Sequence, residues 1–233
     1  MASIISTYVV LRLALRRALN EEQLERNVKR PVLSHEGKLT AYGIAAIGVV
    51  LITASALDVQ LGLPTFLCGV ITAALVLLLS RQSPCPLLKD ISWGVLPLVA
   101  GLFVMVEELI RTGAIGQLSA LLHEAVAQSA TKAMWSVGIA TALATNIANN
   151  LPVGLVAGSI VSADHLPVSV VSAILIGVDL GPNLSVTGSL ATILWLVALR
   201  REGLEVSAWR FLKLGWLVMF PALILALAAL TVW

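Results

Sequence analysis

The chain has 233 residues, of which 58% are hydrophobic and 12% charged, and its mean hydropathy is +0.96. A soluble domain carries about 25% charged residues, so this composition excludes a water-soluble globular protein and a disordered chain. It predicts a polytopic membrane protein. The net charge of +2 does not indicate nucleic-acid binding, and the scattered cysteines and histidines predict neither a metal site nor a cofactor.

The first segment, residues 1–15, is apolar apart from Arg12. As a helix it would extend about 22 Å, which is less than the hydrocarbon core of about 30 Å. It also lacks the basic start of a signal peptide. We therefore expect a truncated transmembrane segment, followed by a basic loop over residues 16–38.

Uncharged runs of about 18 or more residues are typical of membrane-spanning helices. Four such spans are predicted, at about residues 39–57, 61–80, 91–110 and 212–233.

Two further apolar segments, residues 133–163 and 166–199, are too long for simple spans. The distribution of basic residues constrains the first of them, because basic loops stay cytoplasmic. With loop 16–38 inside, a single crossing by residues 133–163 would place the basic residues of 200–213 outside. A re-entrant hairpin instead leaves twelve basic residues inside and two outside, with the C-terminus outside.

The middle of residues 133–163 supports a hairpin. Asn146, Asn149, Asn150 and Pro152 lie there, and asparagine and proline both interrupt helices. Each arm would be about 20 Å long, which suits a tip inside the membrane. A kink in one continuous helix is the alternative interpretation.

Residues 166–199 would form a helix about 51 Å long, so we expect them to break. The sequence Gly177-Val178-Asp179-Leu180-Gly181-Pro182-Asn183-Leu184-Ser185-Val186-Thr187-Gly188-Ser189 predicts an unwound strand between two half-helices. An ionisable residue at membrane depth indicates function, which makes Asp179 a candidate. Asp179 as a helix-packing residue, and the hydroxyl residues as interhelical contacts, are the structural alternatives.

Irregular backbone inside a membrane is tolerated only where protein or a water-filled cavity covers it. A hairpin tip and a broken helix together are typical of a secondary-transporter site. The predicted fold class is therefore all-α: one repeat of an inverted-repeat secondary transporter, with a re-entrant helical hairpin and a broken transmembrane helix.

The two motifs also carry a family resemblance. Asn149-Asn150-Leu151-Pro152, then residues 177–183, then Gly188-Ser189-Leu190-Ala191-Thr192-Ile193-Leu194-Trp195-Leu196 resemble the membrane subunit of arsenite efflux pumps, within a wider ion-transporter superfamily. The resemblance implies that residues 39–233 are the C-terminal repeat and that loop 16–38 is the central cytoplasmic loop. It also implies a separate N-terminal half as a partner.

By resemblance, the multi-pass protein lies in the inner (plasma) membrane and expels arsenite, and also antimonite. Export would be driven by proton exchange or with an arsenite-stimulated ATPase. Near neutral pH arsenite is mostly an uncharged trihydroxide, which suits amides, hydroxyls and backbone groups. The expected substrate-binding residues are Asn146, Asn149, Asn150, Pro152, Gly181, Pro182, Asn183, Ser185, Thr187, Gly188 and Ser189, with Asp179 carrying a coupling proton.

Two other functions stay open. One is an ion/proton antiporter, or a transporter of another anion, from the same superfamily. The other is a membrane fragment or assembly partner that transports nothing by itself. We expect no enzyme, because no serine–histidine or paired-aspartate arrangement lies at predicted membrane depth.

Overall fold

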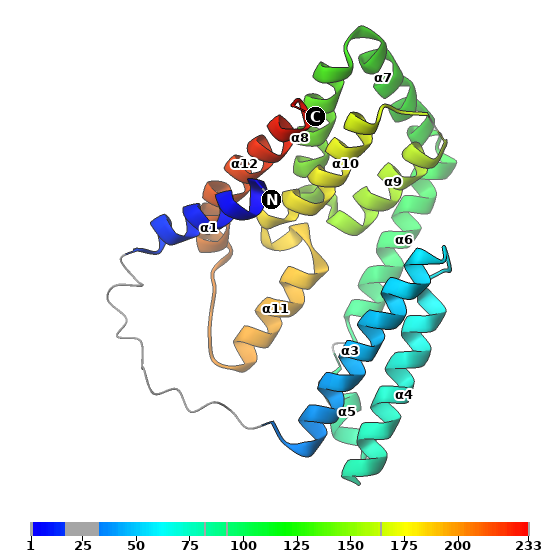
Figure 1. Cartoon of the computed structure of the whole chain (residues 1–233), viewed down its shortest axis with the longest axis vertical. Coiled ribbons are helices and arrows are strands. Elements are labelled where there is room, and N and C mark those ends of the chain that lie inside the picture. The colour runs from blue at the N-terminus through cyan, green and yellow to red at the C-terminus, as the bar shows by residue number, and fades with distance from the viewer. Residues whose placement is uncertain (1, 17–32, 82, 92, 164, 233) are drawn as a thin grey trace. The chain divides into compact units, whose positions relative to one another are not determined.

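The computed structural model describes residues 2–16, 33–81, 83–91, 93–163 and 165–232. These ranges form α-helices and two short 3-10 helices, and no β-strand occurs within them (Figure 1). Three of the helices are long and apolar enough to cross a membrane: α3, His35–Ala56; α4, Gly62–Ser80; and α12, Ala208–Leu230. The predicted class, an all-α polytopic membrane protein, is confirmed.

The chain divides into two compact units, residues 24–93 and residues 1–23 with 94–233. The first unit contains α3, α4 and the short helix α5, Pro84–Asp90. Ser34 caps the start of α3, because its side-chain oxygen accepts the N–H of Gly37 at 3.1 Å. It packs against α4 where Gly43 faces Thr72. Most of the predicted basic loop, residues 17–32, lies outside the described residues.

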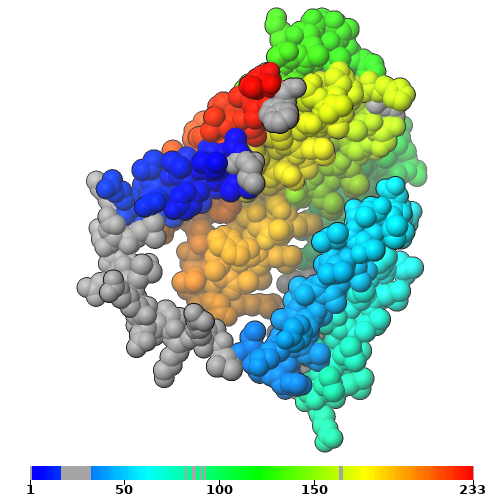
Figure 2. Space-filling model, viewed as in Figure 1, coloured from blue at the N-terminus to red at the C-terminus, as the bar shows by residue number. Residues whose placement is uncertain are grey.

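The second unit contains the remaining helices. Several of them are shorter than the membrane spans predicted from the sequence. α1, Ala2–Ala14, packs against α12, and both are visible in the space-filling view (Figure 2). In the range predicted as span 91–110, the helix α6 is Val95–Arg111. It is followed by α7, Ala114–Gln128. The membrane crossing of α1 and of α6 remains a prediction.

The two long apolar segments each contain more than one helix. Residues 133–163 are divided between two helices, α8 (Ala130–Ala148) and α9 (Asn150–Ala163), with Asn149 between them. Residues 166–199 contain α10, Val168–Leu180, then two 3-10 helices, η1 (Gly181–Asn183) and η2 (Val186–Gly188), and then α11, which is Leu190–Arg201.

The core of this unit lies where α8, α10 and α12 pack together. Met134, Val170, Met219 and Leu227 have almost no exposed surface there. Small residues let the helices approach closely: a Cβ added at Gly177 of α10 would lie 2.6 Å from the carbonyl oxygen of Gly138 in α8. α8 and α10 therefore pack side by side, and the start of the break lies beside α8.

Candidate functional site

The change of direction between α8 and α9 takes place at a single residue, Asn149. Its φ of 70° and ψ of 152° lie in a region that is essentially restricted to glycine. Its side-chain oxygen accepts the N–H of Leu151 at 3.2 Å, which satisfies a donor in the first turn of α9. The interruption is thus narrower than the predicted one, because Asn146 is still within α8 and Asn150 and Pro152 are already within α9.

Asn150 and Pro152 lie in the first turn of α9 and not in the turn between the helices. Proline is tolerated there because N–H groups in the first turn have no intrahelical acceptor. These two residues therefore start the second arm of the hairpin.

The break in the second long segment begins later than the sequence pattern indicates. Gly177 to Leu180 continue α10, and the non-α-helical stretch is residues 181–189. Ser189 ends it, because its side-chain oxygen accepts the N–H of Ala191 at 3.1 Å and caps α11. Asp179 consequently lies in the last turn of a helix.

Glycines allow the broken segment to lie directly against the hairpin. A Cβ at Gly181 would collide with the carbonyl oxygen of Ala142 and lie 2.5 Å from the hydroxyl of Thr145. A Cβ at Gly188 would lie 2.7 Å from the backbone of Pro182. On the other side, Gly215 of α12 lies against the carbonyls of residues 183 and 184.

Asn146 joins the hairpin to the break through both ends of its amide. The Nδ2 group donates to the carbonyls of Ala142, at 2.8 Å, and Gly181, at 2.9 Å. The Oδ1 atom accepts the hydroxyl of Ser185 at 2.8 Å. Asn146 thus holds the break at two points.

A second group of hydrogen bonds lies beside the first. Asn149 donates from Nδ2 to the carbonyl of Thr187 at 3.0 Å. The hydroxyl of Thr187 donates to the carbonyl of Asn146 at 3.0 Å and lies 3.1 Å from the hydroxyl of Ser185. We refer to Asn146, Asn149, Gly181, Ser185 and Thr187 together as the junction.

Three polar side chains near the junction make no hydrogen bond within the described part of the chain: Asn150, Asp179 and Asn183. Asn183 and Asp179 are exposed, and Asn150 is half-buried. Their donors and acceptors are available to a solute or to a partner. The polar residues proposed from the sequence thus fall into two groups. One group forms hydrogen bonds within the protein, and the other forms none within the described part of the chain.

Sequence reasoning did not identify Gly138 or Gly215 as parts of this region and gave Thr145 no role of its own. Thr145 is fully buried and donates to the carbonyl of Ala142 at 2.8 Å. The spacing of Gly138, Ala142 and Thr145 along one face of α8 was the available indication, because small residues mark close helix contacts. Among the described residues, no group of histidine, cysteine and acidic side chains is placed to hold a metal ion.

Comparison with known proteins assigns this arrangement to a family. The model of the arsenical pump membrane protein family matches residues 1–233. The chain is 26% identical to the arsenical pump membrane protein of Escherichia coli K12 over 98% of its own length and 55% of that protein's. An uncharacterized transporter of Mycobacterium tuberculosis is 27% identical, covering 72% of this chain and 40% of the relative.

No solved structure matches the chain. The chain spans about half the length of the Escherichia coli relatives that it matches. The family match over the whole chain, with the helical membrane fold, leads to one conclusion: the chain belongs to the arsenical pump membrane protein family.

Proposed function

We propose that this chain provides one half of a transporter that moves arsenite, and also antimonite, out of the cell. The observation that carries the proposal is the junction, where two interrupted helical elements meet through side-chain and backbone hydrogen bonds. Such interruptions are typical of transporter binding sites. The name of the Escherichia coli relatives supports an arsenical substrate.

The chemistry of the region suits an uncharged, hydroxylated solute. Asn150 and Asn183 each offer an amide donor and an amide acceptor without a partner in the described structure. The amides of Asn146 and Asn149 are already bonded within the protein. We assign Asn150 and Asn183 to solute binding, and Asn146 and Asn149 to positioning the broken segment.

The remaining candidates divide in the same way. Gly181, Pro182 and Gly188 are buried and shape the backbone, while Ser189 caps α11. The hydroxyls of Ser185 and Thr187 belong to the junction but can exchange a hydrogen bond with a bound solute. Thr187 is the more exposed of the two and is the better placed for this exchange.

The proposed assembly has further members. An N-terminal half would complete the transporter, since the chain matches 55% of the length of the Escherichia coli relatives. Export would be coupled to protons, with Asp179 as the carrier, or driven with a cytoplasmic ATPase. We further propose that the loop of residues 16–38 lies in the cytoplasm and that the C-terminus lies outside.

Asp179 favours a second candidate, an ion/proton antiporter or other anion transporter of the same superfamily. An exposed carboxylate in the last turn of a helix is placed unfavourably for the helix dipole, and nothing in the described structure bonds to it. A carboxylate without a structural partner at this position is available for a cation. The third candidate, a membrane component without transport activity, has no specific observation in its favour.

Uptake of radiolabelled arsenite into everted membrane vesicles containing both halves tests the proposal. Asn183→Ala should reduce uptake several-fold without changing thermal stability, because the side chain is exposed and unbonded. Lys132→Ala, an exposed substitution outside the junction, is the control. Saturable uptake of arsenite, without comparable transport of sodium or of other anions, supports the first candidate. Transport of sodium or of other anions, without arsenite uptake, supports the second.

A further inference from the structure

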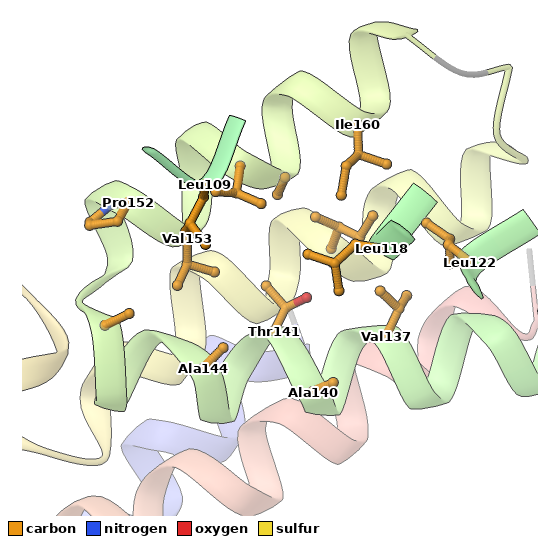
Figure 3. Close-up of a pocket in the computed structure, with 14 residues that line it drawn as sticks. Leu109, Leu118, Leu122, Val137, Ala140, Thr141, Ala144, Pro152, Val153 and Ile160 are labelled. Atoms are coloured by element: carbon orange, nitrogen blue, oxygen red, sulfur yellow. The ribbon is translucent and has the colours of Figure 1, made fainter. Parts of the chain in front are cut away.

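A partly open apolar pocket lies between the two arms of the hairpin (Figure 3). Its volume is about 310 Å³. α8 and α9 provide most of the walls, with contributions from Leu109 of α6, Leu118 and Leu122 of α7, and Ile174 of α10. Thr141 is the single polar side chain of the lining, which otherwise consists of alanine, valine, leucine, isoleucine and proline.

Thr141 and Thr145 are the two buried threonines among the described residues, and only Thr145 forms a side-chain hydrogen bond. Thr53 donates its hydroxyl to the carbonyl of Val49, and Thr145 donates to that of Ala142, as threonines in helices commonly do. The Thr141 hydroxyl makes no such bond within the described residues, although the residue is only 9% exposed. Its oxygen is not sealed off by neighbouring atoms, and the pocket is the space that it faces.

These features restrict what can occupy the pocket. A water molecule needs two to four polar partners, and this lining offers one. An arsenite trihydroxide would leave most of its hydroxyls unbonded for the same reason. A charged group would have no counter-charge, because no charged residue lines the pocket. A pure hydrocarbon would leave the Thr141 hydroxyl without a partner.

We propose that this pocket binds an uncharged amphiphile, a hydrocarbon molecule with one hydroxyl or carbonyl oxygen that hydrogen-bonds to Thr141. If each heavy atom takes about 30 Å³, as a water does in the liquid, the pocket accommodates about ten of them. Medium-chain alcohols have this size and composition. A molecule held there lies between α8 and α9 and resists any change in the angle of the hairpin.

The experiment uses the full chain in lipid vesicles and a photoreactive octanol that carries a diazirine group. Irradiation followed by peptide mass spectrometry should place the adducts on α8 and α9. Unlabelled octan-1-ol should compete with the label, while octane should compete poorly. Thr141→Val keeps the shape of the side chain and should weaken octanol competition about threefold to tenfold, the contribution of one neutral hydrogen bond.

Matched variants separate the pocket from general partition into lipid. Thr53→Val removes a hydroxyl from an exposed position of α3 and should leave labelling unchanged. Ala144→Leu fills the pocket and should abolish labelling of α8 and α9, and Ala157→Leu fills it from the opposite arm if the first variant does not insert. The inference is overturned if the filled variants label normally, or if octane competes as well as octanol and Thr141→Val changes nothing.

Discussion

The side-chain amide of Asn146 donates to the backbone carbonyl of Gly181 over 2.9 Å, although the two residues are 35 positions apart. Gly181 is the first residue after α10, and its carbonyl also accepts the N–H of Leu184 at 3.1 Å. A side chain from the hairpin thus adds a second hydrogen bond to the backbone of the broken segment. This bond joins the two interruptions directly.

Asn146→Ala should loosen the broken segment. The substitution removes one of the two donors to the carbonyl of Gly181, which still accepts the N–H of Leu184. It also removes the acceptor of the Ser185 hydroxyl, which still lies 3.1 Å from the hydroxyl of Thr187. The loss should be about 0.5–1.5 kcal/mol for each hydrogen bond. Hydrogen–deuterium exchange should become faster over residues 181–189. Asn183→Ala, which removes an unbonded amide, is the control, and equal exchange in both variants would contradict this role of Asn146.

Asn149 combines a glycine-like backbone with two side-chain hydrogen bonds, so glycine and alanine should have different effects there. Asn149→Gly loses the hydrogen bonds but accepts the backbone conformation. Asn149→Ala loses the bonds and keeps the strain of this backbone conformation, about 1–3 kcal/mol, which glycine relieves. Thermal unfolding should therefore rank Asn149→Ala below both the wild type and Asn149→Gly. Equal midpoints for the two variants would show that the turn relaxes to another conformation.

Gly181→Ala should be severely destabilising, because the added Cβ collides with the carbonyl of Ala142. We expect a loss of about 1–3 kcal/mol, as for other overpacked sites. Gly158→Ala is the matched control: Gly158 lies in α9 with nothing within 4 Å of the added carbon. Removing a helical glycine there should be neutral or stabilise by up to about 1 kcal/mol. A stable Gly181→Ala protein would mean that the break does not pack tightly on α8.

Asp179→Asn should separate proton-coupled from uncoupled movement of solute. If Asp179 carries the coupling proton, the variant loses uptake driven by a pH gradient and keeps movement down an arsenite gradient. Vesicle uptake with and without the pH gradient measures this. Glu202→Gln, at an exposed position after α11, provides the control. A variant that retains gradient-driven uptake would exclude Asp179 as the carrier.

The sequence predicted the helical reversal and the helix break because both leave strong local marks, namely asparagines with a proline and glycines with a proline. It did not predict that one residue, Asn149, makes the reversal. It also did not show that the side-chain amide of Asn146 is hydrogen-bonded within the protein at both its nitrogen and its oxygen. Two of its partners, Gly181 and Ser185, lie 35 and 39 positions away in the sequence. Local patterns locate interruptions of a helix, whereas tertiary contacts decide which polar groups remain free.

Arsenite accumulation in sensitive cells expressing this chain, alone and together with an N-terminal half from the family, tests the central claim most directly. Membrane insertion of the chain is verified in both cases. The account predicts normal accumulation with the chain alone and reduced accumulation when the second half is present. Unchanged accumulation in both cases, with both proteins inserted, would contradict the proposal that this chain forms part of an arsenite exporter.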